Sequence, residues 1–174
     1  MKDLRIVLIV MLSALLILSS CAHHQRIPPE TTHTVYSAHG GEDAQLRQYA
    51  PLFLTYQHQA AYNHIGRPSA RYDDQGREQV FVDSQKPVIY YLKRSFSTKK
   101  ERYTNLIYRV HFPKIPFSLI PFNLTAGNNI GLIVVITINS HQKPVLVTTV
   151  HTCGCYLAIV PTSFLPREAL PLNW

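Results

Sequence analysis

The sequence holds two strongly apolar runs in close succession, Ile130-Gly-Leu-Ile-Val-Val-Ile-Thr-Ile138 and Val145-Leu-Val-Thr-Thr-Val150. The residues between them, 139–144, are the turn-forming series Asn-Ser-His-Gln-Lys-Pro. The first run is apolar at nearly every position, which is typical of a strand that is buried on both faces. We therefore predict a long antiparallel hairpin at the centre of a β fold.

The second run continues into a chemically reactive cluster, His151-Thr-Cys-Gly-Cys-Tyr156. If the strand stays extended, alternate side chains share a face, so His151, Cys153 and Cys155 would point the same way. One interpretation is a zinc or other soft-metal site formed by these three residues, with His111 or His141 as a fourth ligand. The Cys-x-Cys spacing is shorter than the Cys-x-x-Cys spacing of most structural zinc sites, so zinc stays one candidate cofactor and no cofactor is assigned.

Two other interpretations of the cysteines remain open. Cys153 and Cys155 could form a disulfide, although residues two apart in an extended chain lie near the upper limit of the allowed Cα separation. Gly154 would let the backbone tighten between them. Alternatively, both are inert buried thiols, since unpaired cysteine is among the most buried residue types.

The rest of the chain also favours strands. Residues 105–112 alternate, with one predicted face formed by Leu106, Tyr108, Val110 and Phe112 and the other by Ile107, Arg109 and His111. Further strands are predicted at 52–56, 80–83 and 88–92, a short helix at 42–50 that Pro51 ends, and a polar loop at 69–78. We predict a mainly β fold, a single antiparallel β-sandwich or strongly curved sheet with one short N-terminal helix.

Composition and charge narrow the classes of function. The chain has 174 residues, which suggests one domain, and a formal net charge of +7, which favours anionic partners. It contains no Gly-x-Ser-x-Gly, His-Glu-x-x-His or phosphate-loop motif. After Arg102 the only acidic residue is Glu168, so the best-formed half of the predicted sheet lacks a carboxylate pair for hydrolysis. The sequence favours a non-enzymatic protein over an enzyme.

The N-terminus has the features of a secretory signal. Lys2 and Arg5 precede an apolar run at 6–18, and small residues lead to Cys21. The Leu-Ser-Ser-Cys ending resembles the lipobox of bacterial lipoproteins. This resemblance implies cleavage before Cys21, lipidation of its sulfur and acylation of its amine, for instance by palmitate. The residue after it, Ala22, is similar to those of lipoproteins released to the outer membrane.

These features give an expected organisation of the chain: a lipoprotein signal peptide at 1–20, a polar tether at 21–40 and a β-rich domain at 41–174. We expect a location in the bacterial cell envelope, anchored to the outer membrane by lipid and facing the periplasm. Export makes nucleic acid an unsuitable partner. The basic runs at 93–94 and 99–102 bracket a predicted hairpin turn, which is either a solvated loop end or a tip that contacts anionic headgroups.

Four segments resemble a family of uncharacterised bacterial proteins and lipoproteins. They are Asn63-x-Ile-Gly-x-Pro68, Val82-Asp-x-x-x-Pro-x-x-Tyr-Tyr91, Phe112-Pro113 and His151-x-Cys-Gly-Cys-Tyr156, and the similarity runs from about Ala50 to Pro161. The family implies no activity, cofactor or partner.

Two hypotheses of function follow from the sequence. The first is a lipid-anchored binding or structural module that contacts the membrane, an anionic envelope polymer or another envelope protein. The second is a metal- or thiol-dependent enzyme or redox protein that uses the His-x-Cys-x-Cys cluster.

Overall fold

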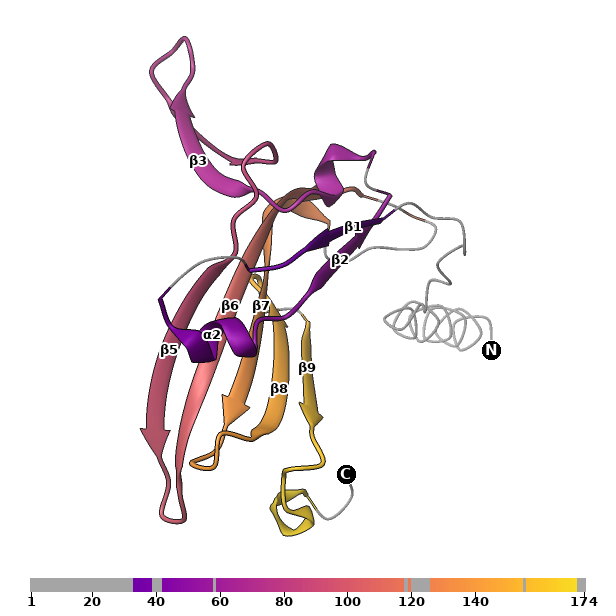
Figure 1. Cartoon of the computed structure of the whole chain (residues 1–174). Helices are drawn as coiled ribbons and strands as arrows, with labels where there is room; N and C mark the ends of the chain where they lie inside the picture. Colours follow the sequence, from indigo (N-terminus) through magenta and orange to yellow (C-terminus); the bar gives the residue numbers. More distant parts are fainter. Residues whose placement is uncertain are drawn as a thin grey trace, which may run out of the picture.

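The computed structural model describes residues 33–38, 42–57, 59–117, 119, 126–154 and 156–171. As predicted, the fold is mainly β and antiparallel, with one short helix near its N-terminus. Its centre is a five-stranded sheet in which each strand pairs with its neighbour along the chain (Figure 1). The strands are β5 (Tyr90–Ser97), β6 (Arg102–Ile115), β7 (Gly127–Ile138), β8 (Pro144–His151) and β9 (Leu157–Pro161).

The central position of the apolar hairpin is confirmed. The strand β7 lies in the middle of the sheet, between β6 and β8. The turn between β7 and β8 is held by Asn139, whose side chain accepts hydrogen bonds from the backbone amides of His141 and Lys143. Because this turn is local in sequence, the pattern of apolar runs was sufficient to predict it.

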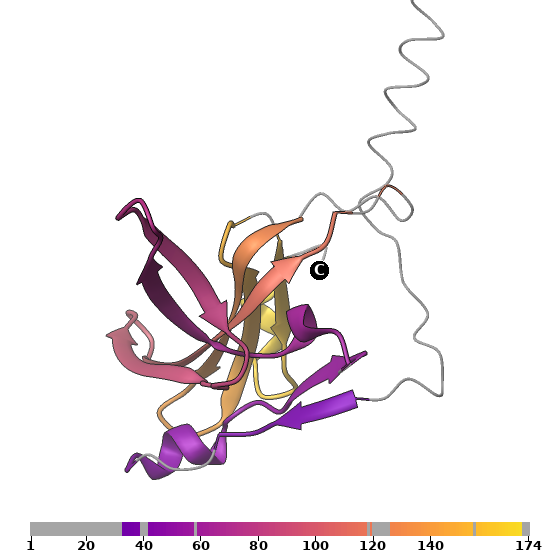
Figure 2. The same ribbon diagram turned by 90° about the horizontal axis from the view of Figure 1, so that it is seen from above.

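One face of the sheet carries the core, and we call it the covered face. The predicted alternation of β6 is confirmed, since Leu106, Tyr108 and Val110 have no exposed surface. Residues of the covering layer pack against them, namely Leu46, Phe53 and Ile65. Viewed from above, α2 (Ala44–Gln48) and the antiparallel pair of β1 (His33–Tyr36) and β2 (Phe53–Tyr56) lie on one side of the sheet (Figure 2).

The helix α2 is fixed to the sheet by polar contacts at its start. The carboxylate of Asp43 caps it by accepting hydrogen bonds from the amides of Gln45 and Leu46, at 2.9 and 3.1 Å. The same carboxylate pairs with the ammonium of Lys93 on β5, 3.0 Å away. The buried hydroxyl of Tyr108 on β6 donates to the carbonyl oxygen of Leu46 at 2.7 Å. These contacts explain why so short a helix holds one position.

The predicted tether at 21–40 extends too far. Its last part forms β1, which pairs with β2 in antiparallel register from His33 opposite Tyr56 to Tyr36 opposite Phe53. Tyr36 packs against the core, and His33 lies against the ring of Tyr56. The prediction failed because four residues are too few to show a strand pattern, and their pairing partner lies 17 residues or more further along the chain.

The predicted loop at 69–78 is also wrong in its first half. Residues 67–72 form β3 (Arg67–Tyr72), which pairs with β4 (Glu78–Asp83) as a hairpin that projects beyond one end of the sheet (Figure 1). The turn chemistry was correctly predicted, since Asp73 accepts hydrogen bonds from the amides of Gln75 and Arg77. The strand was missed because β3 has no buried face and therefore no apolar alternation.

The predicted signal peptide and the lipidation site Cys21 lie outside the described residues. Within the described ranges, no helix combines the length and apolar character needed to cross a membrane.

Candidate docking face and the cysteine loop

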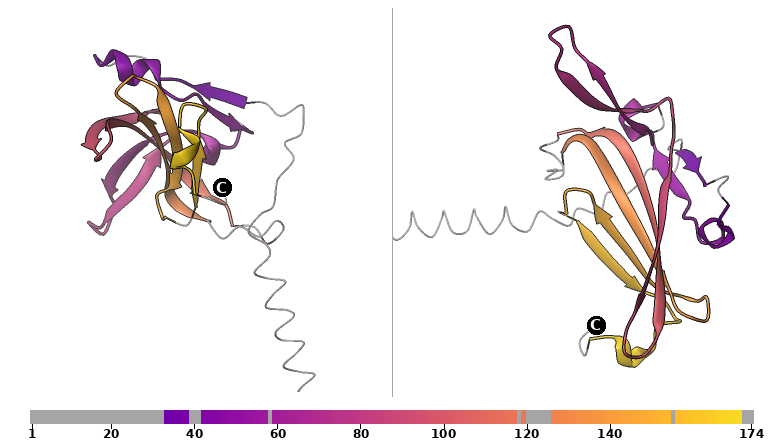
Figure 3. Two further views of the ribbon diagram at one scale, coloured as in Figure 1. Left: turned by 90° about the horizontal axis from the view of Figure 1, so that it is seen from below. Right: turned by 90° about the vertical axis from the view of Figure 1, so that its left-hand side faces the viewer.

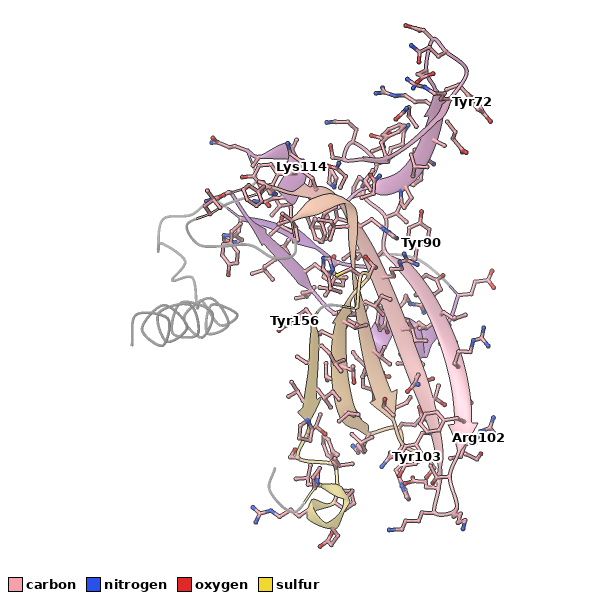
Figure 4. The ribbon with its side chains drawn as sticks, turned by 180° about the vertical axis from the view of Figure 1, so that it is seen from behind. Tyr72, Tyr90, Arg102, Tyr103, Lys114 and Tyr156 are labelled. Atoms are coloured by element: carbon pink, nitrogen blue, oxygen red, sulfur yellow. The ribbon has the colours of Figure 1, made fainter. Side chains whose placement is uncertain are left out.

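We call the face of the five-stranded sheet opposite the covered face the open face. Thr152 packs against its end beside Gly131 and His111, and no described element packs over the rest of it. Figure 4 views the sheet from this side, with Tyr90 and Tyr103 labelled on it and with α2 behind the sheet. The side view in Figure 3 likewise places the covering layer on one side only. The open face is therefore a large surface available to a partner.

The strand register aligns the side chains of the open face in rows that cross all five strands. The central row is apolar except at one position and runs Leu92, Ile107, Val135, Thr148, Ile159. The next row contains Arg109 beside Ile133 and continues to Val150 and Leu157.

Exposed apolar side chains lie on this face from one edge of the sheet to the other. Leu92 is 48% exposed, Phe96 43% and Ile159 42%, and Ile133 and Val135 are only partly buried. Single exposed apolar residues are common on proteins, but a contiguous apolar surface usually marks an interaction site.

The five strands of the sheet contain basic residues and no acidic ones. Strands β5–β9 contain no acidic residue, whereas they contain the cations Lys93, Arg94, Arg102, Arg109 and Lys114. Arg94 and Arg109 belong to the open face by register. The carboxylate nearest in sequence is Glu101 in the β5–β6 turn, and it accepts a hydrogen bond from the amide of Ser140 at 3.0 Å. Hydrogen bonds from Ser140 lower the pKa of Glu101. A partner of the open face would thus meet apolar and cationic groups.

The predicted extended arrangement of His151 and Cys153 is wrong, because β8 ends at His151 and the chain turns. The amide of His151 donates to the carbonyl of Tyr156 at 3.0 Å, and the amide of Gly154 donates back to the carbonyl of His151 at 2.8 Å. Gly154 has a φ of +75°, a left-handed conformation that glycine adopts without steric cost. We call residues 151–156 the cysteine loop.

Cys153 is disulfide-bonded, and its partner lies outside the described residues. The pairing with Cys155 therefore stays a prediction. Cys153 is exposed, so the interpretation as an inert buried thiol does not fit it. Nδ1 of His151 lies 2.9 Å from Sγ of Cys153. The turn at Gly154 provides the tightening that the sequence-based disulfide hypothesis required.

The structure does not bring His111 to the other predicted metal ligands. His111 is in register with Gly131 on the open face, whereas His151 is in register with Leu132 and so belongs to the covered face. His141 lies in the β7–β8 turn, at the other end of β8. No group of three or more His, Cys, Asp or Glu side chains in the described part of the chain could hold a metal ion. Since Cys155 is not described, a site made of His151, Cys153 and Cys155 stays a prediction.

A junction around His111 was not foreseen from the sequence. His111 is only 9% exposed, its carbonyl accepts a hydrogen bond from the amide of Gly66 at 2.9 Å, and the ring of Tyr90 meets its ring edge-on at 5.9 Å. Burial, assisted by the charge of Arg109, lowers the pKa of His111. The neutral ring therefore persists at a lower pH than usual.

The same junction gathers segments that the family resemblance singled out. A Cβ atom on Gly66 would lie 2.5 Å from the carbonyl oxygen of Asp83, so only glycine allows this approach. Ile65 is fully buried, and Thr152 accepts a hydrogen bond from the amide of Gly131 beside His111. These residues therefore have structural roles in joining the β3–β4 hairpin and the cysteine loop to the sheet.

Fold and site together define an antiparallel β protein with one covered and one open sheet face. No family model, curated protein or solved structure matches the chain. The resemblance to the lipoprotein family therefore stays a prediction.

Proposed function

We propose that this protein is a lipid-anchored binding module of the bacterial cell envelope, and that a partner docks on its open face. The observation that carries the proposal is the open face itself, an apolar surface that crosses five strands containing no acidic residue. Burying apolar surface of this kind stabilises a complex by about 25 cal/mol per Å² before the costs of association.

The N-terminal sequence supports the anchor. A basic start, an apolar run at 6–18 and the Leu-Ser-Ser-Cys ending lead to lipidation of Cys21, and Ala22 directs the protein to the outer membrane. Two or more acyl chains hold a protein at a membrane far more firmly than one. The cysteine loop acts in this proposal as a local structural staple at the end of the β8–β9 hairpin.

Metabolic labelling with palmitate tests the anchor. We expect the wild-type protein to take up label and to sediment with membranes. The variant Cys21→Ser should lose the label, and Cys153→Ser is the matched control that should keep it. Undiminished labelling of Cys21→Ser would overturn the proposed anchor.

Binding of the anionic apolar dye 1-anilinonaphthalene-8-sulfonate tests the open face. The dye reports exposed apolar surface, and its sulfonate suits the cations of this face. We expect the folded protein to enhance its fluorescence and the double variant Leu92→Ser/Ile159→Ser to lose most of that enhancement. Tyr72→Ser is the control, because Tyr72 is 75% exposed on the distant β3–β4 hairpin. If the control loses as much signal as the double variant, the open face is not the binding surface.

Thiol chemistry at the cysteine loop is the second candidate function. The observation that favours it is that the disulfide-bonded Cys153 is exposed, with His151 Nδ1 2.9 Å from its Sγ, since exposed disulfides are the more readily reduced ones. Intact mass measurement of the mature protein tests it. A mass lower by two hydrogen atoms than the reduced chain indicates a disulfide, and zinc retained in native spectra indicates a metal site. If both cysteines react freely with an alkylating reagent and no metal is released, the hypothesis loses both its disulfide form and its metal form.

A further inference from the structure

We propose that the partner of the open face is an anionic lipid membrane surface, and that the β5–β6 hairpin makes the leading contact. This inference rests on the proposed function and names its partner. The membrane would meet the apolar row through its interfacial layer and the surrounding cations through its phosphate groups.

The β5–β6 hairpin has the charge that such a surface attracts. Every residue of β5 is exposed, and exposed cations flank the turn, namely Arg94, Lys99, Lys100 and Arg102. The turn is ordered by Thr98, whose amide donates to the carbonyl of Glu101 at 2.9 Å. Because Glu101 is engaged with Ser140, its carboxylate is directed toward the β7–β8 turn. The hairpin therefore presents a net positive charge.

Aromatic side chains lie among these cations. Phe96 stacks on Tyr103, with ring centroids 5.5 Å apart and an interplanar angle of 21°. Tyr90, further along β5, is 42% exposed and shares the open face with both rings. Tyrosine rings, which are apolar with a hydroxyl at one end, favour the boundary between acyl chains and headgroups, and Phe96 adds apolar surface beside them.

Other partners suit this face less well. In the central row, Thr148 alone has a side-chain hydrogen-bond donor or acceptor for the hydroxyl groups of a polysaccharide, and the other four side chains are apolar. A second copy of the chain would bring Arg94 and Arg109 against a surface with the same positive charge and no acidic residue in strands β5–β9 to pair with them. An anionic membrane supplies apolar and anionic groups together, and the anchor at Cys21 would hold the domain beside it.

Vesicle sedimentation tests this inference with the mature chain carrying Cys21→Ser, which keeps every described element and lacks the acyl anchor. The probes are vesicles of phosphatidylglycerol with phosphatidylethanolamine and, for comparison, vesicles of phosphatidylcholine. Each cation near an anionic surface raises partitioning about fivefold. We therefore expect Arg94→Ser to reduce partitioning to anionic vesicles about fivefold and Lys99→Ser/Lys100→Ser about 25-fold. High salt should weaken the binding, because screening shortens the reach of surface charges.

Lys114→Ser is the matched control, since it removes the same charge from the other face of β6. It should leave partitioning within twofold of the parent, and circular dichroism should show the same fold for all variants. Equal partitioning to neutral and anionic vesicles, or an equal effect of Lys114→Ser and Arg94→Ser, would overturn the inference. Absent vesicle binding together with retained dye binding would overturn the membrane as partner and leave the proposed docking face standing. Loss of both would overturn the docking face as well.

Discussion

Replacing Tyr108 with phenylalanine should destabilise the fold by removing one hydroxyl from the core. The ring of Tyr108 has no exposed surface, and its hydroxyl donates to the carbonyl oxygen of Leu46 in α2 at 2.7 Å. Phenylalanine keeps the ring and its packing, so the substitution isolates the hydrogen bond between the sheet and the covering helix.

The substitution leaves the carbonyl oxygen of Leu46 without the hydroxyl that donates to it, and this loss sets the size of the effect. A hydrogen bond of this kind contributes about 0.5–1.5 kcal/mol, and a buried group that loses its partner costs about 1–3 kcal/mol. Leu46 is 7% exposed, so water has little access to its carbonyl in the variant. We expect the free energy of unfolding to fall by about 1–3 kcal/mol, which corresponds to a fall in Tm of roughly 3–10 °C for a domain of this size.

The pH dependence supplies a second and independent result. Burial, with a contribution from the charge of Asp43, raises the pKa of Tyr108 from 10.0 to about 12. The Tyr108 pKa is higher in the folded state than in the unfolded state. The neutral hydroxyl therefore contributes its full stability at a pH below the unfolded-state pKa, and this contribution is lost as the pH rises through the folded-state pKa. The advantage of the wild type over Tyr108→Phe should therefore be constant below pH 10 and shrink as the pH rises from 10 to about 12.

Urea denaturation followed by far-ultraviolet circular dichroism measures both results, at neutral pH and along an alkaline series. The control is Tyr72→Phe, since Tyr72 is 75% exposed on the β3–β4 hairpin and its loss of a hydroxyl should leave stability unchanged. The reasoning would be refuted if Tyr108→Phe matched the wild type at neutral pH, or if the difference between the two proteins stayed constant through the alkaline range.

Three further predictions concern local structure. Gly131→Ala should lower the urea midpoint, because its Cβ would lie 2.6 Å from the nearest side chain, whereas Gly127→Ala on the same strand meets nothing within 4 Å and should be neutral. Asp43→Asn should remove part of the acid sensitivity of the fold. The hydrogen bond from Lys93 lowers the pKa of Asp43 below 3.8. The stability that the Asp43 carboxylate contributes is therefore present above pH 3.8 and is lost as the pH falls through the lowered pKa. An acid unfolding transition that is the same in both proteins would contradict this. Cys153→Ser should lower thermal stability if the cysteine loop is a staple, and unchanged stability would contradict that role.

The elements that the sequence predicted well are those whose evidence is local. The β7–β8 hairpin combines two apolar runs with a turn between them, and the alternation at 105–112 shows which side chains of β6 enter the core. In both cases the partner strand is near in sequence, or the buried face is continuous along one strand. When one face of a strand is buried, apolar residues recur at every second position of its sequence.

Elements without such a pattern were missed for physical reasons. The strand β3 is exposed at five of its six positions, so no face of it selects apolar residues. The cysteine loop turns because Gly154 adopts a φ of +75°, and the hydrogen bond between His151 and Tyr156 closes it. Nothing in the residue types alone distinguishes this turn from an extended continuation of β8. The pairing of His111 with Gly66 is likewise a tertiary contact between distant segments.

On the open face, the structure differs from the burial that the sequence pattern predicts. A run such as 130–138, apolar on both faces, is typical of a strand covered on both sides. In the described chain only one side of β7 is covered: Val134 and Ile138 are buried, whereas Ile133 and Val135 remain partly exposed. Among the described residues, none forms the second layer that the apolar pattern of this strand predicts. Exposed apolar rows carry a cost in water and a risk of aggregation, and their presence on all five strands is the reason that we propose a partner for this face. In the proposed docking, the cations at the edge of those rows would meet anionic groups of the partner, because no carboxylate of the five strands pairs with them.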